Sequence, residues 1–157
     1  MNHRIAQKLW KGCNNCIHIT IGRTEWTSGH GYWMAHASIV GREPNHKQVA
    51  ETDSRKINRA FVKRLTGDAR KVQSVSDRRL VAETWYGWTE PLIKYDCGPS
   101  SAVFVNADYH DALDAICPAD LRADPWTSAL SWWSPSGYPV AILMGGRVAH
   151  GSEVKSA

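Results

Sequence analysis

The sequence predicts an α+β protein made of three repeats, each with one helix followed by short antiparallel strands. Three segments place apolar residues at helical spacing, and the runs between them alternate apolar and polar residues as half-buried strands do. The length of 157 residues fits one ordinary domain, and a hydrophobic content of 43% is typical of a folded protein. Repeats of this kind pair their strands edge to edge and lay their helices on one face.

The first repeat ends with a polar connector. Residues 3–10 predict a short helix with one apolar side and a glycine just past its end. Residues 17–22 alternate isoleucine with polar side chains, which predicts a half-buried strand. A turn at residues 28–31 leads into a second predicted strand at 32–40, and the connector at 41–49 contains a proline.

The clearest predicted helix opens the second repeat. Asp53 or Ser54 caps its start and Gly67 ends it. One apolar stripe runs along this helix through Ile57, Phe61 and Leu65. A different face carries the cations Arg55, Lys56, Arg59 and Lys63.

Four strands are predicted after this helix. Two strand-like runs at 71–76 and 80–85 stand on either side of a charged turn at 77–79, and shorter strands follow at 92–95 and 102–105.

The third repeat begins with a helix at 107–116, where apolar side chains recur at helical spacing until Pro118 stops the pattern. Two strands at 130–133 and 140–144 then flank the turn 134–139, whose sequence is SPSGYP.

Charge is distributed unevenly along the chain. The net charge is +4 at pH 7, with +3 on residues 1–41, +6 on residues 42–79 and −5 on residues 80–157. This distribution fits a basic face turned toward phosphates, and it fits equally a solvated surface of uneven charge. No stretch approaches the ~20 apolar residues that cross a bilayer. The N-terminus also lacks the apolar run of a secretory signal, so we expect a cytoplasmic protein without a membrane partner.

Four short motifs occur in the order that one known family shows. Residues 41–49 read GREPNHKQV, where the family has G-R-F-P-D-Y followed by basic residues and valine. Ala60-Phe61 matches a pair in the family's next helix, residues 105–113 (VNADYHDAL) match F-N-x-x-Y-L-x-D-x-L, and residues 142–147 (ILMGGR) match a V-V-M-P-M-R-like ending. In these motifs the chain resembles the β sliding clamp of bacterial DNA polymerase III, over the last half of that family's middle domain and its third domain.

The resemblance implies a domain organisation and an assembly. Residues 1–49 would form half a clamp-like domain with its connector, residues 50–148 a clamp-like C-terminal domain, and residues 149–157 a disordered tail. Subunits of the family form a ring with helices on the inner wall and a continuous sheet on the outer wall. If such a ring has twelve helix-and-strand units, this chain supplies three. The resemblance therefore implies a homo-oligomer of four copies, a decoy that pairs with a full clamp, or a truncated clamp.

The implied function is to hold or modulate DNA polymerase and other replication factors on double-stranded DNA, for example for a phage or a mobile element, without catalysis or a cofactor. Basic side chains on the inner helices contact phosphates without reading sequence, which permits sliding because every register has a similar energy. The DNA-binding residues implied are Arg55, Lys56, Arg59 and Lys63, with Lys8 and Arg4 as companions. The predicted helix at 107–116 departs from this scheme, because its aspartates repel phosphate.

The family also holds short peptides of polymerases and repair proteins in an apolar pocket near the domain junction. By position, half of this pocket would be lined by Pro44 and Val49 of the connector and by Ile142 and Met144 of the last strand. Gln48 stands where the family has a basic residue, and MGGR replaces the proline-containing ending. An ordinary connector and core strand remains the alternative interpretation of these positions.

The cysteines offer a second hypothesis, in which zinc staples the fold. Cys13 and Cys16 form a CxxC pair that brings two thiolates to one tetrahedral metal, and His18, Cys97 or Cys117 would complete the site. The alternative is that these cysteines are small apolar fillers in a protein of a reducing compartment.

The tryptophans offer a third hypothesis, a module for single-stranded nucleic acid. The aromatic segment 84–91 and the pair Trp132 and Trp133 could stack bases, or they could pack on sheet faces. For an enzyme the sequence offers only His110 next to Asp111 and the serines within 98–101, without a nucleophile elbow, phosphate loop or HExxH motif. We therefore expect no catalytic activity.

Overall fold

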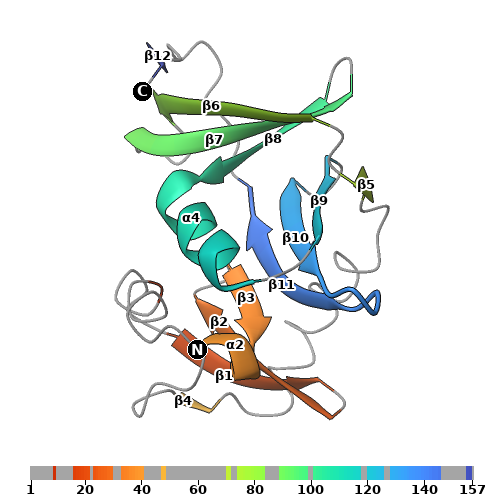
Figure 1. Cartoon of the computed structure of the whole chain (residues 1–157). Coiled ribbons are helices and arrows are strands. Elements are labelled where there is room, and N and C mark those ends of the chain that lie inside the picture. Colours follow the sequence, from red (N-terminus) through yellow and green to blue (C-terminus); the bar gives the residue numbers. More distant parts are fainter. Residues whose placement is uncertain are drawn as a thin grey trace.

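The structure is a computed structural model (Figure 1), and it describes a defined part of the chain. The described residues are Leu9, 16–21, 23–29, 33–40, 47–48, 70–71, 74–83, 89–98, 101–117, 120–125, 128–145 and 155–156. Their strands are mostly antiparallel and form two sheets, accompanied by few helices, which agrees with the predicted α+β class. Among these residues no helix is long and apolar enough to cross a membrane.

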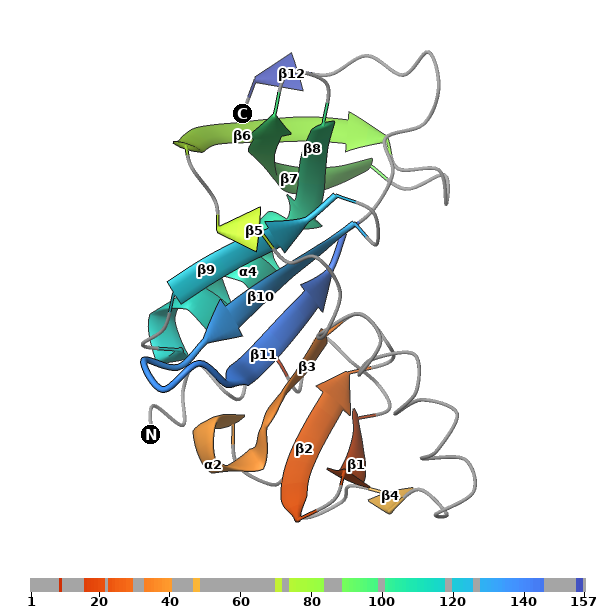
Figure 2. The ribbon, with the colours of Figure 1, turned by 90° about the vertical axis from the view of Figure 1, so that its right-hand side faces the viewer.

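The larger sheet, sheet A, takes its eight strands from both halves of the chain (Figure 2). In spatial order they are β4 (Lys47–Gln48), β1 (Cys16–Ile21), β2 (Thr24–Gly29), β3 (Trp33–His36), β11 (Pro139–Met144), β10 (Ala129–Trp133), β9 (Asp120–Asp124) and β5 (Arg70–Lys71). Strands β1 and β4 run parallel, and the other neighbours are antiparallel. The β3–β11 pair joins the two sets of strands, so sheet A is continuous across both units that the sequence predicts.

The smaller sheet, sheet B, contains four antiparallel strands. Their order is β12 (Lys155–Ser156), β6 (Ser74–Glu83), β7 (Thr89–Gly98) and β8 (Ser101–Asn106). Within the tail predicted to be disordered, the structure describes only Lys155–Ser156, which pair with Leu80 and Val81 of β6.

Helix α4 (Ala107–Ile116) lies between the two sheets, beside β11 and directly after β8 (Figures 1 and 2). Asn106 caps its start, because the Asn106 side-chain oxygen accepts hydrogen bonds from the backbone N–H groups of Asp108 at 3.0 Å and Tyr109 at 3.1 Å. The second described helix, α2 (Ala37–Val40), is a single turn after β3.

Sheet A is buried on both faces because its strands alternate between two apolar clusters. The face toward α4 contributes to the main core, in which Trp33, Leu130, Trp132 and Leu143 pack with Leu113 of the helix. The other face forms a second cluster, here called the junction cluster. Its members are Ile19, Trp26, Met34, Ala129 and Ile142, all buried, with the partly buried Met144 packed against them.

Several predicted elements are confirmed. The strands predicted at 17–22, 92–95, 102–105, 130–133 and 140–144 correspond to β1, β7, β8, β10 and β11. The helix predicted at 107–116 has those bounds in the structure. The helix predicted at 53–66 lies outside the described residues, and of the helix predicted at 3–10 only Leu9 is described, in helical conformation.

Other predictions were wrong. The charged turn predicted at 77–79 lies within strand β6: Arg78 and Arg79 pair with Lys94 and Ile93 of β7, and the register shifts between Ser74 and Arg78. The strand predicted at 32–40 ends at His36 and gives way to α2; the Ser38 hydroxyl lies 3.2 Å from the His36 ring Nδ1, a local contact that favours a turn. Strands β2 and β9 were not predicted at all.

Candidate functional site

The cations expected to contact DNA lie outside the described residues: Arg4, Lys8, Arg55, Lys56, Arg59 and Lys63. Pro44 and Val49 of the expected peptide pocket also lie outside them. Of the residues implied by the resemblance, the structure therefore describes Ile142 and Met144.

Ile142 and Met144 share one face of β11 and lie at the seam where the two halves of sheet A meet. Ile142 is paired with Met34 of β3, and Met144 with Ala129 of β10. Both pack in the junction cluster, where Trp26 and Met34 come from the first half of the chain. Ile142 is 1% exposed and Met144 is half-buried, so Met144 is the member of the pair that an apolar ligand can reach.

The residues that complete this cluster were missed by sequence reasoning. Trp26 lies on β2, whose alternation is masked by Thr27 and Ser28, two polar residues that are fully buried. Met34 lies within the strand predicted at 32–40, but nothing local assigned it to this cluster. The Ser28 hydroxyl is satisfied internally, because it donates to the Trp33 carbonyl at 3.2 Å. A pattern of apolar against polar residues cannot reveal a strand of this kind.

The exposed side of α4 is acidic. Asp108, Asp111 and Asp114 are all exposed. Asp114 also accepts a hydrogen bond of 3.1 Å from the indole N–H of the buried Trp132, which ties the helix to β10. This side of α4 repels phosphate, as the sequence indicates, so any contact with DNA has to come from other elements.

His110 is held inside the protein between two polar partners. Its Nε2 lies 2.5 Å from the Tyr95 hydroxyl on β7, and its Nδ1 lies 3.2 Å from Asp111. The ring is 6% exposed and lies 6.0 Å from the centroid of the Trp132 ring. Both ring nitrogens of His110 therefore have a hydrogen-bond partner. The arrangement therefore fastens α4 to sheet B and leaves no ring nitrogen directed at a substrate.

Cys97 and Cys117, the cysteines whose side chains are described, are free thiols near the main core. Burial, with a smaller contribution from the charge of Asp114, raises the pKa of the Cys117 thiol to about 12. Burial also raises the pKa of the Cys97 thiol, and the neighbouring Asp96 adds to this effect. Zinc binds the thiolate, so a zinc site that used either residue would include the free-energy cost of removing its proton. Within the described ranges, no three His, Cys, Asp or Glu side chains are grouped as metal ligands.

The two tryptophans of β10 point to opposite faces of sheet A. Trp132 is fully buried in the main core, so it cannot stack a base. Trp133 is half-buried, and the Arg122 guanidinium lies over its ring at 4.3 Å from the centroid. Within this pair only Trp133 remains a stacking candidate, and residues 84–88 of the aromatic segment lie outside the described residues. Arg122 is a partner that the sequence did not indicate, because β9 was not predicted.

Comparisons with known proteins give no match. No family model matches the chain, and neither a curated protein nor a solved structure matches it.

Proposed function

We propose that this chain is a non-catalytic, clamp-like protein that holds DNA polymerase or other replication factors on duplex DNA through sequence-independent phosphate contacts. The observation that supports the proposal best is the continuity of sheet A. Strand β3 of the first half pairs with β11 of the second half through Trp33, Met34 and Ala35, and α4 covers one face of the resulting sheet. A continuous sheet with helices on one side is the kind of wall that the resemblance implies for a DNA-encircling ring.

The proposal assigns the phosphate contacts to a single cationic segment. Arg55, Lys56, Arg59 and Lys63 supply the positive charge, while the exposed side of α4 is acidic and is assigned no phosphate contact. Contacts to the phosphate backbone alone leave all registers on the duplex nearly equal in energy, so the protein slides.

Retention on circular and linear duplex DNA tests the proposal. We expect the protein, after loading on a nicked circle, to stay bound through a high-salt wash and to leave when the circle is cut, because a ring slides off free ends. A protein that merely binds phosphates would be lost from both templates to the same extent in the salt wash, which would contradict the proposal.

Charge reversal shows which cations matter. Lys56→Glu and Arg59→Glu are expected to reduce duplex binding and to lower the slope of log K against log salt by about 0.9 for each phosphate that the variant no longer neutralises. Arg23→Glu is the matched control, because Arg23 is an exposed cation on the turn between β1 and β2. Equal losses in all three variants would show that only the net charge matters.

Assembly is part of the same proposal. We expect native mass spectrometry to find four associated copies, or a complex with a clamp subunit when one is supplied. A mass spectrum that shows only the monomer, with and without added clamp subunits, would rule out both the ring of four copies and the complex with a clamp.

The junction cluster is the proposed docking place for peptides of partner proteins. Met144 is its accessible member, and the buried Ile142 supports the surface from beneath. We expect Met144→Ala to weaken the capture of a clamp-binding peptide at least threefold while the fold is retained, because a flexible apolar side chain is removed from the surface. If Met144→Ala captures the peptide as well as the wild type does, the peptide does not bind at the junction cluster.

A further inference from the structure

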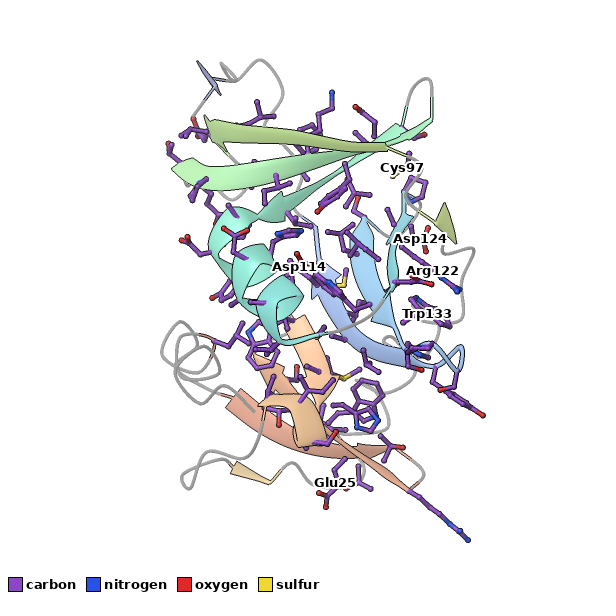
Figure 3. The ribbon with its side chains drawn as sticks, in the orientation of Figure 1. Glu25, Cys97, Asp114, Arg122, Asp124 and Trp133 are labelled. Carbon is purple, nitrogen blue, oxygen red and sulfur yellow. The ribbon has the colours of Figure 1, made fainter. Side chains whose placement is uncertain are left out.

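Arg122 and Trp133 form a layered pair on the side of sheet A that faces away from α4 (Figure 3). The guanidinium carbon of Arg122 lies 4.3 Å from the centroid of the Trp133 ring, a distance typical of cation–π stacking. The ring itself is fixed, because its N–H donates a hydrogen bond of 2.8 Å to the hydroxyl of Ser131, which is 5% exposed. The pair is therefore a rigid platform.

The guanidinium of Arg122 has no counter-charge within the part of the chain that the structure describes. Asp120 and Asp124 lie two residues away on the same strand, but among the described residues no carboxylate comes within ion-pair distance of Arg122 and none forms a hydrogen bond with its side chain. A guanidinium carries five N–H donors in a planar fork that suits phosphate and carboxylate oxygens. Stacking on Trp133 orients the Arg122 guanidinium, so its N–H groups can donate to an anion.

Tyr138 is an exposed aromatic residue close to this pair along the chain. It is 70% exposed, and it lies in the turn that joins β10 to β11, directly before Pro139, the residue paired with Trp133. Its backbone is fixed, since the carbonyl oxygen accepts a 2.7 Å hydrogen bond from Ser134 N and the N–H donates to the Ser134 hydroxyl at 3.2 Å. An exposed aromatic ring on a well-ordered turn is suited to stacking.

We propose that Arg122, Trp133 and Tyr138 bind one nucleotide of single-stranded nucleic acid. The N–H groups of Arg122 donate to the phosphate, and the base stacks on the aromatic surface that Tyr138 and the Arg122–Trp133 pair offer. A base inside a duplex has both faces covered, so the site selects unpaired strands. The neighbouring exposed Asp120 repels further phosphates, which limits the site to a single nucleotide.

This inference is independent of the proposed duplex tethering, because it rests on another surface and other residues. The variant Lys56→Glu/Arg59→Glu is expected to lose retention on duplex circles and to keep most of its affinity for a single strand. The two proposals can therefore fail separately.

The experiment is fluorescence anisotropy of a dye-labelled short oligothymidylate at low salt. We expect Tyr138→Ser to weaken binding at least fivefold, the lower limit for the loss of one stacked base. Arg122→Gln is expected to weaken binding about tenfold and to lower the salt slope by about 0.7, the value for one phosphate contact on a single strand. The control Arg23→Gln removes an exposed cation elsewhere and should change binding less than twofold.

Two results would overturn the proposal. One is an equal effect of Arg122→Gln and Arg23→Gln together with wild-type binding by Tyr138→Ser, which would mean that only overall charge matters. The other is displacement of the oligothymidylate by an acidic peptide as readily as by unlabelled oligothymidylate, which would mean that the site recognises carboxylates. Tyr138 is exposed, so Tyr138→Ser remains informative even if Arg122→Gln perturbs the fold.

Discussion

Two buried tryptophans of the core differ in whether their indole N–H group has a hydrogen-bond partner. Trp132 and Trp33 are both fully buried, and both carry an indole N–H. Trp132 donates this N–H to Asp114, whereas the N–H of Trp33 has no hydrogen-bond partner among the described residues. A buried donor without a partner costs about 1–3 kcal/mol, so the two side chains contribute unequally to stability.

Substitution by phenylalanine is expected to separate these two cases. Trp132→Phe and Trp33→Phe lose a similar volume, but only Trp132→Phe breaks a hydrogen bond and leaves Asp114 without its indole donor. Urea unfolding should show Trp132→Phe to be more destabilising by about 1–3 kcal/mol. Equal losses would mean that the Trp33 N–H does find an acceptor in solution.

The thiol of Cys117 makes stability depend on alkaline pH. Its pKa is raised from 9.0 to about 12 on folding, so the folded state holds the proton more tightly than the unfolded chain. The stabilisation is complete below about pH 9 and is lost as pH rises toward 12. Relative to Cys117→Ala, the wild-type free energy of unfolding should therefore fall by up to about 1.4 kcal/mol per pH unit in this window. Urea titrations at pH 8 and pH 10.5 measure this difference, and parallel pH dependence of the two proteins would contradict it.

At the scale of elements, helix α4 depends on its N-cap. The Asn106 side chain satisfies two of the backbone N–H groups at the start of the helix, those of Asp108 and Tyr109. Asn106→Ala is expected to lower the free energy of unfolding by about 1 kcal/mol, whereas Asn106→Asp retains the acceptor and should be neutral. Thermal or urea unfolding of both variants checks the role of the cap, and an equal loss in both would assign the effect to something other than capping.

Gly145, directly after β11, lies very close to the backbone of Phe104 in β8 and of Ser128, the residue before β10. A Cβ at Gly145 would lie 2.5 Å from the Ser128 carbonyl oxygen and 2.8 Å from the Phe104 carbonyl oxygen, so β8 and the start of β10 would have to move. Gly145→Ala is expected to cost about 2–3 kcal/mol. Gly137→Ala is the control: it meets no atom within 4 Å and costs only the strain of its left-handed backbone, about 1 kcal/mol. A smaller loss for Gly145→Ala than for Gly137→Ala would show that these strands separate easily.

At the scale of the whole molecule, the two predicted units share their apolar interior. Trp33 and Val40 of the first half belong to the main core together with residues from the second half, and the junction cluster is mixed in the same way. We therefore expect one cooperative unfolding transition, with the same urea midpoint by tryptophan fluorescence and by far-UV circular dichroism. Separate midpoints would show that residues 1–49 and 50–148 unfold independently.

Local signals predicted some elements well. Helix α4 was predicted with its bounds because its spacing of apolar residues and the following Pro118 are encoded within a dozen neighbouring positions. Strands β8, β10 and β11 carry enough apolar residues to be recognised alone. The basic candidates at 55–63 follow from a sequence pattern, and they remain a prediction because they lie outside the described residues.

The sequence by itself determined the α+β class, the helix at 107–116 and the strands with clear apolar content. Only the tertiary structure decided that β2 and β9 are strands, that 77–79 belongs to β6, and that Arg122 meets Trp133. Helix spacing and capping act between near neighbours in the chain, whereas strand pairing draws its hydrogen bonds from partners that can be more than a hundred residues away, as β3 and β11 are. A short polar strand is stable only when it pairs with a partner strand, so no local sequence pattern predicts it.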